Sequence, residues 1–286
     1  MAKQVMISGA RGDLGSYLSR GFRDRGDEVF TFGHDHPHRL DLFIHCAAKL
    51  KNVDGGELVE GNIDFLRNAL DLAKETRCGA FIFLSSLSLY ESGHEVISED
   101  TPLSCADPYS CTKLLGEHLV KDANLPSLAI RIPAILERKV KPTNFVSRIY
   151  GSLEKGEPVT IYETNREFNS FISMNDLFGF LVNLPPLKGF DFINLASPLE
   201  FTLGGLVRLI HQLTGSTSIT EVRELRDGVN SQIDITKARS KFRYQPGEVA
   251  DSLRQWHEER KSRSLFLQNH VDAHNRRHDQ FTSRRS

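Results

Sequence analysis

Short apolar runs alternate with longer amphipathic segments over the first two thirds of the chain. Runs that are apolar on both faces are typical of strands buried on both sides, as in a parallel sheet covered by helices. The segments between the runs have helical spacing, and alternating strands and helices predict an α/β fold with a doubly wound parallel sheet. The predicted strands lie within residues 4–9, 28–33, 42–48, 80–86, 127–132 and 190–196, and the predicted helices include 14–25, 60–76 and 109–122.

The alternation becomes less regular after Ile132. Residues 142–162 and 202–216 look like helix-containing insertions, and we expect them to form a smaller C-terminal lobe near the carboxyl ends of the strands, where ligands bind in such sheets. The sheet domain would then cover residues 1–132 and the lobe most of residues 133–262. The end of the chain lacks apolar residues, so residues 263–286 are predicted to be a disordered tail.

Composition and charge narrow the classes of partner. The 286 residues include 36 Lys and Arg against 37 Asp and Glu, a formal net charge of -1, so no broad basic field exists to bind nucleic acid. Nowhere do about 18 apolar residues run together, as a membrane-spanning helix needs. The cysteines show no paired metal-ligand spacing, which suits a reducing compartment. We therefore predict a cytoplasmic protein that binds a small molecule, with no nucleic-acid or membrane partner.

A glycine-rich loop follows the first predicted strand and opens the first predicted helix. Its three glycines permit a tight turn, close approach of the backbone to a pyrophosphate and close helix packing. The helix N-terminus adds amide donors and a partial positive charge. The spacing G-x-x-G-x-x-G also occurs in plain strand-to-helix turns, but its place after the first strand favours a dinucleotide site. The predicted cofactor-binding residues of this loop are Gly9, Arg11, Gly12, Asp13, Leu14 and Gly15.

The end of the second predicted strand bears on which dinucleotide binds. An NAD site places an acidic residue there, about 20 residues beyond the loop, to bind the ribose 2′-hydroxyl. Here Gly33 occupies that place, and Asp35 comes two residues late. Arg11 could then bind a 2′-phosphate through a charge-assisted hydrogen bond, or it could be a solvated loop charge. The pattern favours NADP over NAD.

A tyrosine and a lysine four residues apart follow a helix-start signal. Asp107 can cap the helix and Pro108 suits its first position, so Tyr109 and Lys113 should lie on one helix face. A free phenol has a pKa near 10, and a nearby ammonium stabilises the phenolate and lowers that pKa. The pair could therefore deliver a proton, although any helix offers many pairs at this spacing.

Four features occur in one order at compatible distances: the glycine loop, HCAA at residues 45–48, the serines Ser85 and Ser86, and the Tyr109–Lys113 pair. Together they resemble the extended short-chain dehydrogenase/reductase family, in its NAD-dependent epimerase/dehydratase branch, which modifies nucleotide sugars. The resemblance covers roughly residues 3–260. It implies a Rossmann-type sheet and an enzyme that binds NAD(P). It also implies that residues 168–196 return to the sheet and that Ala47, Ala48, Tyr109 and Lys113 contact the cofactor.

The resemblance further implies catalytic roles. Ser86 would hydrogen-bond the reacting substrate oxygen, Tyr109 would exchange a proton with it, and Lys113 would support the tyrosine. Ser86 could instead cap a local turn. Dehydratases of the family carry an Asp-Glu pair after this serine, where Leu87 and Ser88 stand here. Dehydration is therefore disfavoured, which leaves an epimerase or a reductase acting at a carbinol or ketone carbon, and the NADP-like loop favours reduction slightly.

The sequence departs from the family pattern between Phe32 and Asp41. Only eight residues intervene, whereas a parallel crossover usually takes about a dozen or more. We therefore expect the third strand of the family and its helix to be missing, which leaves residues 33–40 to cover the adenine. The three histidines of this segment lack the further ligands that a metal site needs, so no metal is predicted.

The predicted substrate lobe departs from the family as well. An asparagine that usually touches the sugar nucleotide aligns with Ala134, and an arginine that commonly binds the pyrophosphate aligns with Asn169. Because arginine suits bidentate phosphate binding, we expect nearby arginines, chiefly Arg166 and Arg226, to take that role. Family members often pair through the helices that here span 60–76 and 109–122, so a homodimer is predicted. The alternative function is a non-catalytic NAD(P)-binding sensor or interaction protein of the same fold.

Overall fold

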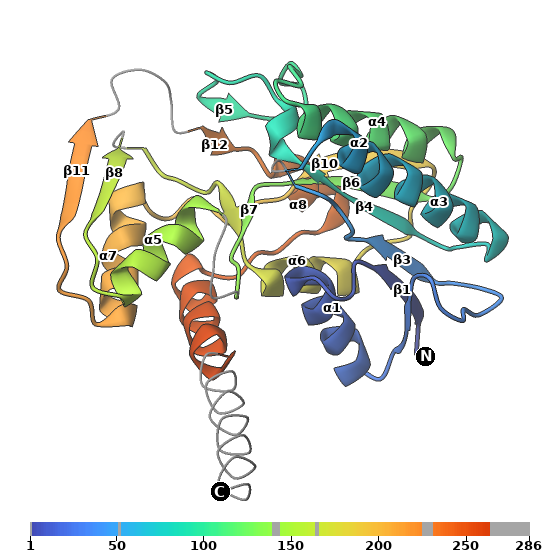
Figure 1. Ribbon diagram of the computed structural model, residues 1–286, viewed down its shortest axis with the longest axis horizontal. Coiled ribbons are helices and arrows are strands. Elements are labelled where there is room, and N and C mark those ends of the chain that lie inside the picture. The colour runs from blue at the N-terminus through green and yellow to red at the C-terminus, as the bar shows by residue number, and fades with distance from the viewer. Residues whose placement is uncertain (1, 51–52, 139–143, 164–165, 225–230, 264–286) are drawn as a thin grey trace, which may run out of the picture.

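The structure is a computed structural model that describes residues 2–50, 53–138, 144–163, 166–224 and 231–263. Its centre is a six-stranded sheet with the order β10-β6-β4-β3-β1-β2, in which all neighbouring strands run parallel (Figure 1). The predicted α/β sheet is confirmed, and each strand lies within one of the predicted runs. The strands are β1 (Gln4–Ser8), β2 (Glu28–Thr31), β3 (Leu42–His45), β4 (Phe81–Ser86), β6 (Ser127–Ile132) and β10 (Phe190–Asn194).

The strand side chains alternate between two apolar layers, because successive residues of a strand point to opposite faces of the sheet. In β1, Val5 and Ile7 join the cluster on the face covered by α1 (Asp13–Asp24) and α6 (Met174–Val182). Met6 joins the cluster on the opposite face, which α3 (Phe65–Glu75) and α4 (Pro108–Asp122) cover. Figure 1 shows these two helix layers on either side of the sheet. Burial on both faces explains why the strands read as continuous apolar runs.

The helix predicted over residues 60–76 is part of a longer helical segment. It runs as α2 (Gly55–Val59), a π-helical turn η1 (Glu60–Asp64) and then α3. Asn62, in the π-helical turn, accepts a hydrogen bond from the Lys49 N–H at 2.7 Å and donates to Thr112 Oγ1 at 3.0 Å. This side chain therefore joins the loop that follows β3 to helix α4.

The sheet ends at β2, and residues 32–41 contain no strand or helix. Phe32 still donates its N–H to Ile7 O at 3.3 Å, and Gly33 then turns the chain with φ 93°, a conformation that glycine adopts without steric cost. The missing third strand and helix were predicted from the length of this connection. The three histidines of the segment, His34, His36 and His38, are exposed.

A smaller lobe lies beside the sheet domain, at the left of Figure 1. Its elements are α5 (Phe145–Glu154), β8 (Val159–Glu163), α7 (Leu203–Thr214), β11 (Thr220–Glu224) and a helix over residues 249–263. The helices and β8 share a separate apolar cluster that includes Tyr150 and Trp256, and β11 pairs with β8. Both predicted insertions thus contain helices, and the assignment of this lobe to substrate stays a prediction.

Short parallel pairs connect the lobe to the sheet domain. They are β7 (Ala134–Ile135) with β9 (Phe171–Ile172), and β5 (Val96–Ile97) with β12 (Gln232–Ile233). The chain then forms α8 (Thr236–Phe242) against the sheet. Residue 263, the first of the predicted tail, lies in the last described helix, and the rest of the predicted tail lies outside the described residues. Within the part of the chain that the structure describes, no helix is long and apolar enough to cross a membrane.

Candidate active site

The glycine loop packs too closely for side chains at two of its three glycines. A Cβ at Gly15 would lie 2.2 Å from Gly9 O, and a Cβ at Gly9, where φ is 71°, would lie 2.9 Å from the Ala47 N atom. Gly12 is the N-cap of α1, and it provides no side-chain cap. The loop therefore brings β1, β3 and an open helix N-terminus together, an arrangement that suits an anionic group.

Asp13, in the first turn of α1, is turned toward two arginines. Its carboxylate accepts hydrogen bonds from the Arg138 N–H at 2.8 Å and from Arg138 Nη2 at 3.2 Å. Arg263, on the last described helix, donates to the same carboxylate. Because both cations offset the acidic charge, Asp13 does not repel an anion at the helix N-terminus.

One cavity of about 300 Å³ connects the glycine loop with the predicted catalytic residues. It extends from the N-terminus of α1, along the end of β3, to the end of β4 and the first turns of α4. The predicted residues that line it are Gly9, Gly12, Asp13, Leu14, Gly15, Ala48, Ser86, Tyr109 and Lys113. These residues come from four separate stretches of sequence, so the fold brings together most of the predicted site.

Two hydrogen bonds orient the predicted catalytic side chains. Tyr109 and Ser86 share a side-chain hydrogen bond, and Lys113 Nζ donates to Leu84 O at 2.8 Å. The Asp107 cap begins α4 as predicted, with its carboxylate accepting the Ser110 N–H at 2.9 Å. Ser86 also accepts the Ser88 N–H at 3.1 Å, so this serine both caps a turn and faces the tyrosine.

Burial decides the protonation of the pair. It raises the pKa of Tyr109 to about 12, against a smaller opposing effect of the hydrogen bond with Ser86. It lowers the pKa of Lys113 to about 8, although Cys46 and Glu117 favour the charged lysine. The pKa of Tyr109 therefore shifts upward, opposite to the sequence-based expectation, because burial outweighs the hydrogen bond with Ser86. Lys113 Nζ is directed to Leu84 O and lies 5.7 Å from the tyrosine ring centroid. The phenol is suited to donate a proton.

A buried ion pair lies behind the catalytic helix, and the sequence analysis missed it. Glu117 accepts two hydrogen bonds from Arg131, at 2.9 and 2.7 Å, and one from Ser85 Oγ at 2.6 Å. Arg131 also donates to Tyr90 Oη at 2.8 Å. The sequence did contain one indication of this acidic partner: Glu117 follows Lys113 by four residues and so lies on the same face of α4.

A second cavity, of about 530 Å³, adjoins the first and shares Ser86, Ile132 and Pro133 with it. Its other lining residues are serines and apolar side chains, and none of the described residues that line it is charged. The full lining is Ser86, Leu87, Ser88, Ile97, Ile132, Pro133, Ala134, Phe168, Ser170, Ser231 and Ile233. This second cavity therefore meets the first at Ser86.

Several predicted site residues lie elsewhere. Arg11 is exposed and Ala47 packs against Gly9, and neither lines the first cavity, which is called the cofactor cavity below because it contains the predicted cofactor-binding loop. Arg166 forms an exposed ion pair with Glu95 at 2.7 Å and does not line the second cavity. Arg226 lies outside the described residues. The cofactor cavity has further lining that no sequence signal indicated, including Glu137, Asn144 and Met174.

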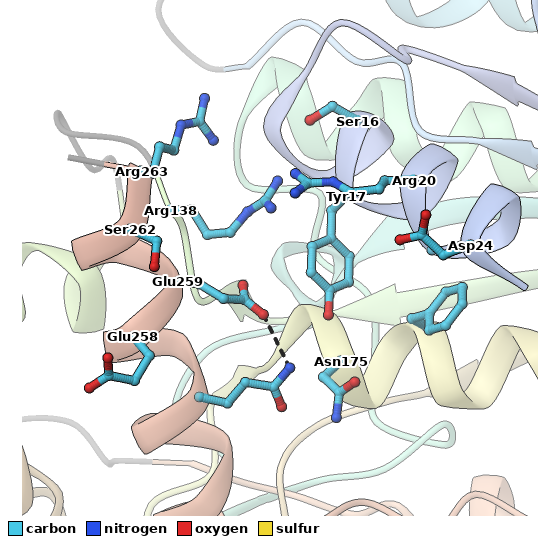
Figure 2. Close-up of a pocket in the computed structure, with 13 residues that line it drawn as sticks. Ser16, Tyr17, Arg20, Asp24, Arg138, Asn175, Glu258, Glu259, Ser262 and Arg263 are labelled. Atoms are coloured by element: carbon cyan, nitrogen blue, oxygen red, sulfur yellow. Dashed lines mark hydrogen bonds between the residues drawn. The ribbon is translucent and has the colours of Figure 1, made fainter. Parts of the chain in front are cut away.

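A third cavity, of about 910 Å³ and so larger than the two above, lies away from these residues. Figure 2 shows Tyr17, Arg20 and Asp24 of α1 facing Glu258, Glu259 and Arg263 of the last described helix across it. Its charges are mixed, and Arg138 stacks over the Tyr17 ring at 4.7 Å. The described residues also contain no group of three or more histidine, cysteine or acidic side chains that could hold a metal ion.

Comparison with known proteins agrees with this geometry. The sequence model of the NAD dependent epimerase/dehydratase family matches residues 34–183. An uncharacterized UDP-glucose epimerase, YtcB, of Bacillus subtilis (strain 168) is 25% identical over 221 residues, covering 72% of this chain and 70% of the relative. UDP-glucuronic acid decarboxylase 5 of Arabidopsis thaliana is 24% identical over 292 residues, covering 85% of this chain and 84% of the relative.

Among solved structures, UDP-glucuronic acid 4-epimerase from Bacillus cereus in complex with NAD has the same fold. Its TM-score is 0.74 at 18% identity, and the match covers 91% of this chain and 99% of that one. The chain thus belongs to the NAD dependent epimerase/dehydratase family of enzymes. The family resemblance and the α/β fold predicted from the sequence are both confirmed.

The burial of Lys113 predicts a pH-dependent stability difference. The folded pKa of about 8 lies below the ordinary 10.5, so the charged lysine costs stability below pH 8, and the cost disappears as the pH rises through 10.5. At roughly 1.4 kcal/mol per pKa unit, Lys113→Met should be more stable than the natural protein by up to about 3 kcal/mol near pH 6.5. This advantage should shrink toward pH 10 in urea unfolding.

Lys121→Met, at an exposed position of the same helix, is the matched control and should show no such pH dependence. An unchanged difference between Lys113→Met and the natural protein at pH 6.5 and pH 10 would contradict the lowered pKa of Lys113.

Proposed function

We propose that this protein transfers hydride between NAD(P) and a carbinol or ketone carbon of a nucleotide sugar, as an epimerase or a reductase. The observation that carries the proposal is the single cavity in which the glycine loop, Ser86, Tyr109 and Lys113 meet. A dinucleotide fold without turnover has no need for the last three side chains. The names of the similar proteins, which act on UDP-sugars, support a nucleotide-sugar substrate.

The loop residues fit a dinucleotide. Gly9 and Gly15 leave room for the backbone alone, and Gly12 leaves the N-terminus of α1 without a side-chain cap, where a pyrophosphate would accept its amides. Lys113 and Tyr109 lie at the far end of the same cavity, where the nicotinamide half would lie. When bound, the cofactor supplies the hydride acceptor or donor, and the protein supplies orientation and proton transfer.

The proton would move at Tyr109 Oη. The phenol, with a pKa of about 12, is protonated at neutral pH, so it can donate to a substrate oxygen that gains charge during reduction. Ser86, hydrogen-bonded to it, would hold the same oxygen. Lys113 is largely protonated at pH 7, and its charge would stabilise the phenolate that remains. Oxidation of a carbinol would instead need Tyr109 as a resting phenolate to accept the proton, and the raised pKa disfavours that form at neutral pH, which favours the reductive assignment.

The second cavity favours an uncharged sugar. Its hydroxyl groups, from Ser86, Ser88, Ser170 and Ser231, suit the hydroxyls of a hexose. A sugar carboxylate would lose water there without a cation among the described lining residues, which is costly. This lining supports an epimerase or reductase of a neutral hexose over decarboxylation of a uronic acid.

A second candidate is a cofactor-binding sensor, and the short connection over residues 33–40 favours it. Without the third strand and its helix, the adenine side has less protein to cover it. Slow or absent turnover with tight nucleotide binding would support the sensor.

The homodimer and the cytoplasmic location also stay predictions. Of the two helices expected to form the dimer interface, α4 exposes the apolar Leu115, whereas α3 exposes the charged Arg67 and Asp71.

Tyr109→Phe should abolish proton transfer and leave the nucleotide site intact. We expect hydride exchange with a UDP-hexose or its keto form to fall by about 10²- to 10⁴-fold, while the affinity for nucleotide measured by fluorescence stays within about twofold. Tyr162→Phe, at an exposed tyrosine of β8, is the control. Equal activity of Tyr109→Phe and the natural protein would rule out Tyr109 as the proton donor.

Nucleotide titration tests the preference for NADP. The loop after β1 and the turn after β2 follow neighbouring strand ends, because Ile7 pairs with Thr31, so Arg11 could reach a 2′-phosphate held there. We expect NADPH to bind more tightly than NADH, and Arg11→Ala to weaken NADPH about tenfold while leaving NADH unchanged. Arg23→Ala, at an exposed arginine of α1, should change neither. If NADH binds more tightly in the natural protein, the NADP assignment fails.

Comparison of two sugars tests the neutral substrate. UDP-glucose should be turned over with a kcat/KM at least about tenfold above that for UDP-glucuronic acid, because the described cavity lining offers no partner to a carboxylate. Ser170→Lys should shift the ratio toward the uronic acid. A natural preference for UDP-glucuronic acid would show that a cation outside the described residues completes the cavity.

A further inference from the structure

Two cysteines lie close together at the start of α4. Cys111, in the first turns of α4, donates its S–H to Cys105 O at 3.5 Å. Burial raises the pKa of Cys105, and the neighbouring Cys111 adds to that rise. Cys105 is partly exposed and Cys111 is exposed. The pair encloses Tyr109, because Cys105 precedes the tyrosine by four residues and Cys111 follows it by two.

The other two cysteines lie in different surroundings. Cys78 is buried and donates to Ala80 O at 3.2 Å, and burial raises its pKa to about 11. Cys46 lines the cofactor cavity, and burial raises its pKa to about 12. A thiol must lose its proton to react, so neither is suited to exchange near neutral pH. Among the cysteines of the described residues, only Cys105 and Cys111 combine exposure with a direct contact to another cysteine residue.

We propose that Cys105 and Cys111 form a reversible disulfide by exchange with a low-molecular-weight disulfide such as oxidised glutathione, and that this bond switches the catalytic turn off. The exposed Cys111 thiol loses its proton to solvent and attacks one sulfur of the small disulfide, releasing one small thiolate, which takes up a proton. Cys105 then attacks the Cys111 sulfur of the mixed disulfide and releases the second small thiol. Both cysteines are oxidised, and one small disulfide is reduced to two thiols.

Closing the bond would move the catalytic tyrosine. A disulfide holds its sulfurs about 2.05 Å apart, so these two thiols, which are not bonded in the structure, must move closer together. The chain has little slack there, because Ser104 donates its N–H to Leu89 O at 2.9 Å and Asp107 caps α4. The movement therefore falls on residues 105–106 and on the first turn of α4, which carries Tyr109. A misplacement of about 1 Å can cost about 10²-fold in rate.

Peptide mapping tests the bond without any assumption about activity. Asp107 lies between the two cysteines, so cleavage before aspartate separates residues 100–106, with Cys105, from residues 107–121, with Cys111. After incubation of the full chain with oxidised glutathione and blocking of free thiols, these two peptides should remain joined and separate on reduction. Cys105→Ser should instead retain glutathione on Cys111, and Cys78→Ser should behave like the natural chain.

Free thiols at both positions, a stable glutathione adduct in the natural chain, or a Cys111–Cys111 bond between two chains would each overturn the disulfide. The effect on catalysis rests on the proposed function and is measured separately. Hydride exchange should fall by about ten- to a hundredfold on oxidation, recover with dithiothreitol, and stay constant in Cys111→Ser. A mapped disulfide with unchanged activity would refute the switch, whereas a protein without hydride exchange in either state would refute the proposed function and leave the mapped bond standing.

Discussion

The buried pair of Glu117 and Arg131 holds the catalytic helix on the sheet. Arg131 lies in β6 and Glu117 lies in α4, so their two hydrogen bonds join the helix to the sheet. Apolar packing is not directional and would not by itself fix the position of the helix along the sheet. Glu117 also accepts Ser85 Oγ, whose neighbour Ser86 faces Tyr109. Breaking such a pair by removing one partner typically costs about 3–5 kcal/mol, because the remaining charge is buried without compensation. The positions of the Ser86 and Tyr109 hydroxyls therefore depend on the Glu117–Arg131 ion pair, which contacts neither of them.

The same helix face shows how burial assigns chemical roles. Lys113 and Glu117 lie one turn apart, and the negative charge of Glu117 opposes the loss of the lysine's proton. Tyr109, nearer the helix start, faces Ser86, and its raised pKa keeps it protonated at neutral pH. One helix face thus carries three groups with different proposed roles: Glu117 in an ion pair, Lys113 as a cation with a lowered pKa, and Tyr109 as the proton donor.

Local pattern predicted the sheet well, because each strand is buried on both faces and so reads as an unbroken apolar run. The length of the connection after Phe32 was sufficient to predict the missing strand, since chain reach is a hard limit. The pKa of Tyr109 was predicted in the wrong direction because helical spacing shows proximity to Lys113 but not the burial that raises the pKa of the phenol. Glu137 and Asn144 could not be found from sequence, because they reach the cofactor cavity from a stretch that has no periodic pattern.

The sheet ends at β2, without the third strand of the family, and this affects how long a bound dinucleotide would remain on the protein. With β2 as the last strand, a dinucleotide seated on the glycine loop would have one flank open to solvent, so its binding energy would come mainly from the pyrophosphate and the nicotinamide end. Less contact area shortens residence, since affinity differences within a family of complexes arise mostly in the dissociation rate. A short residence time burdens an epimerase, which must keep its cofactor through two hydride transfers, and it suits a catalyst that discards the spent nucleotide after each turnover.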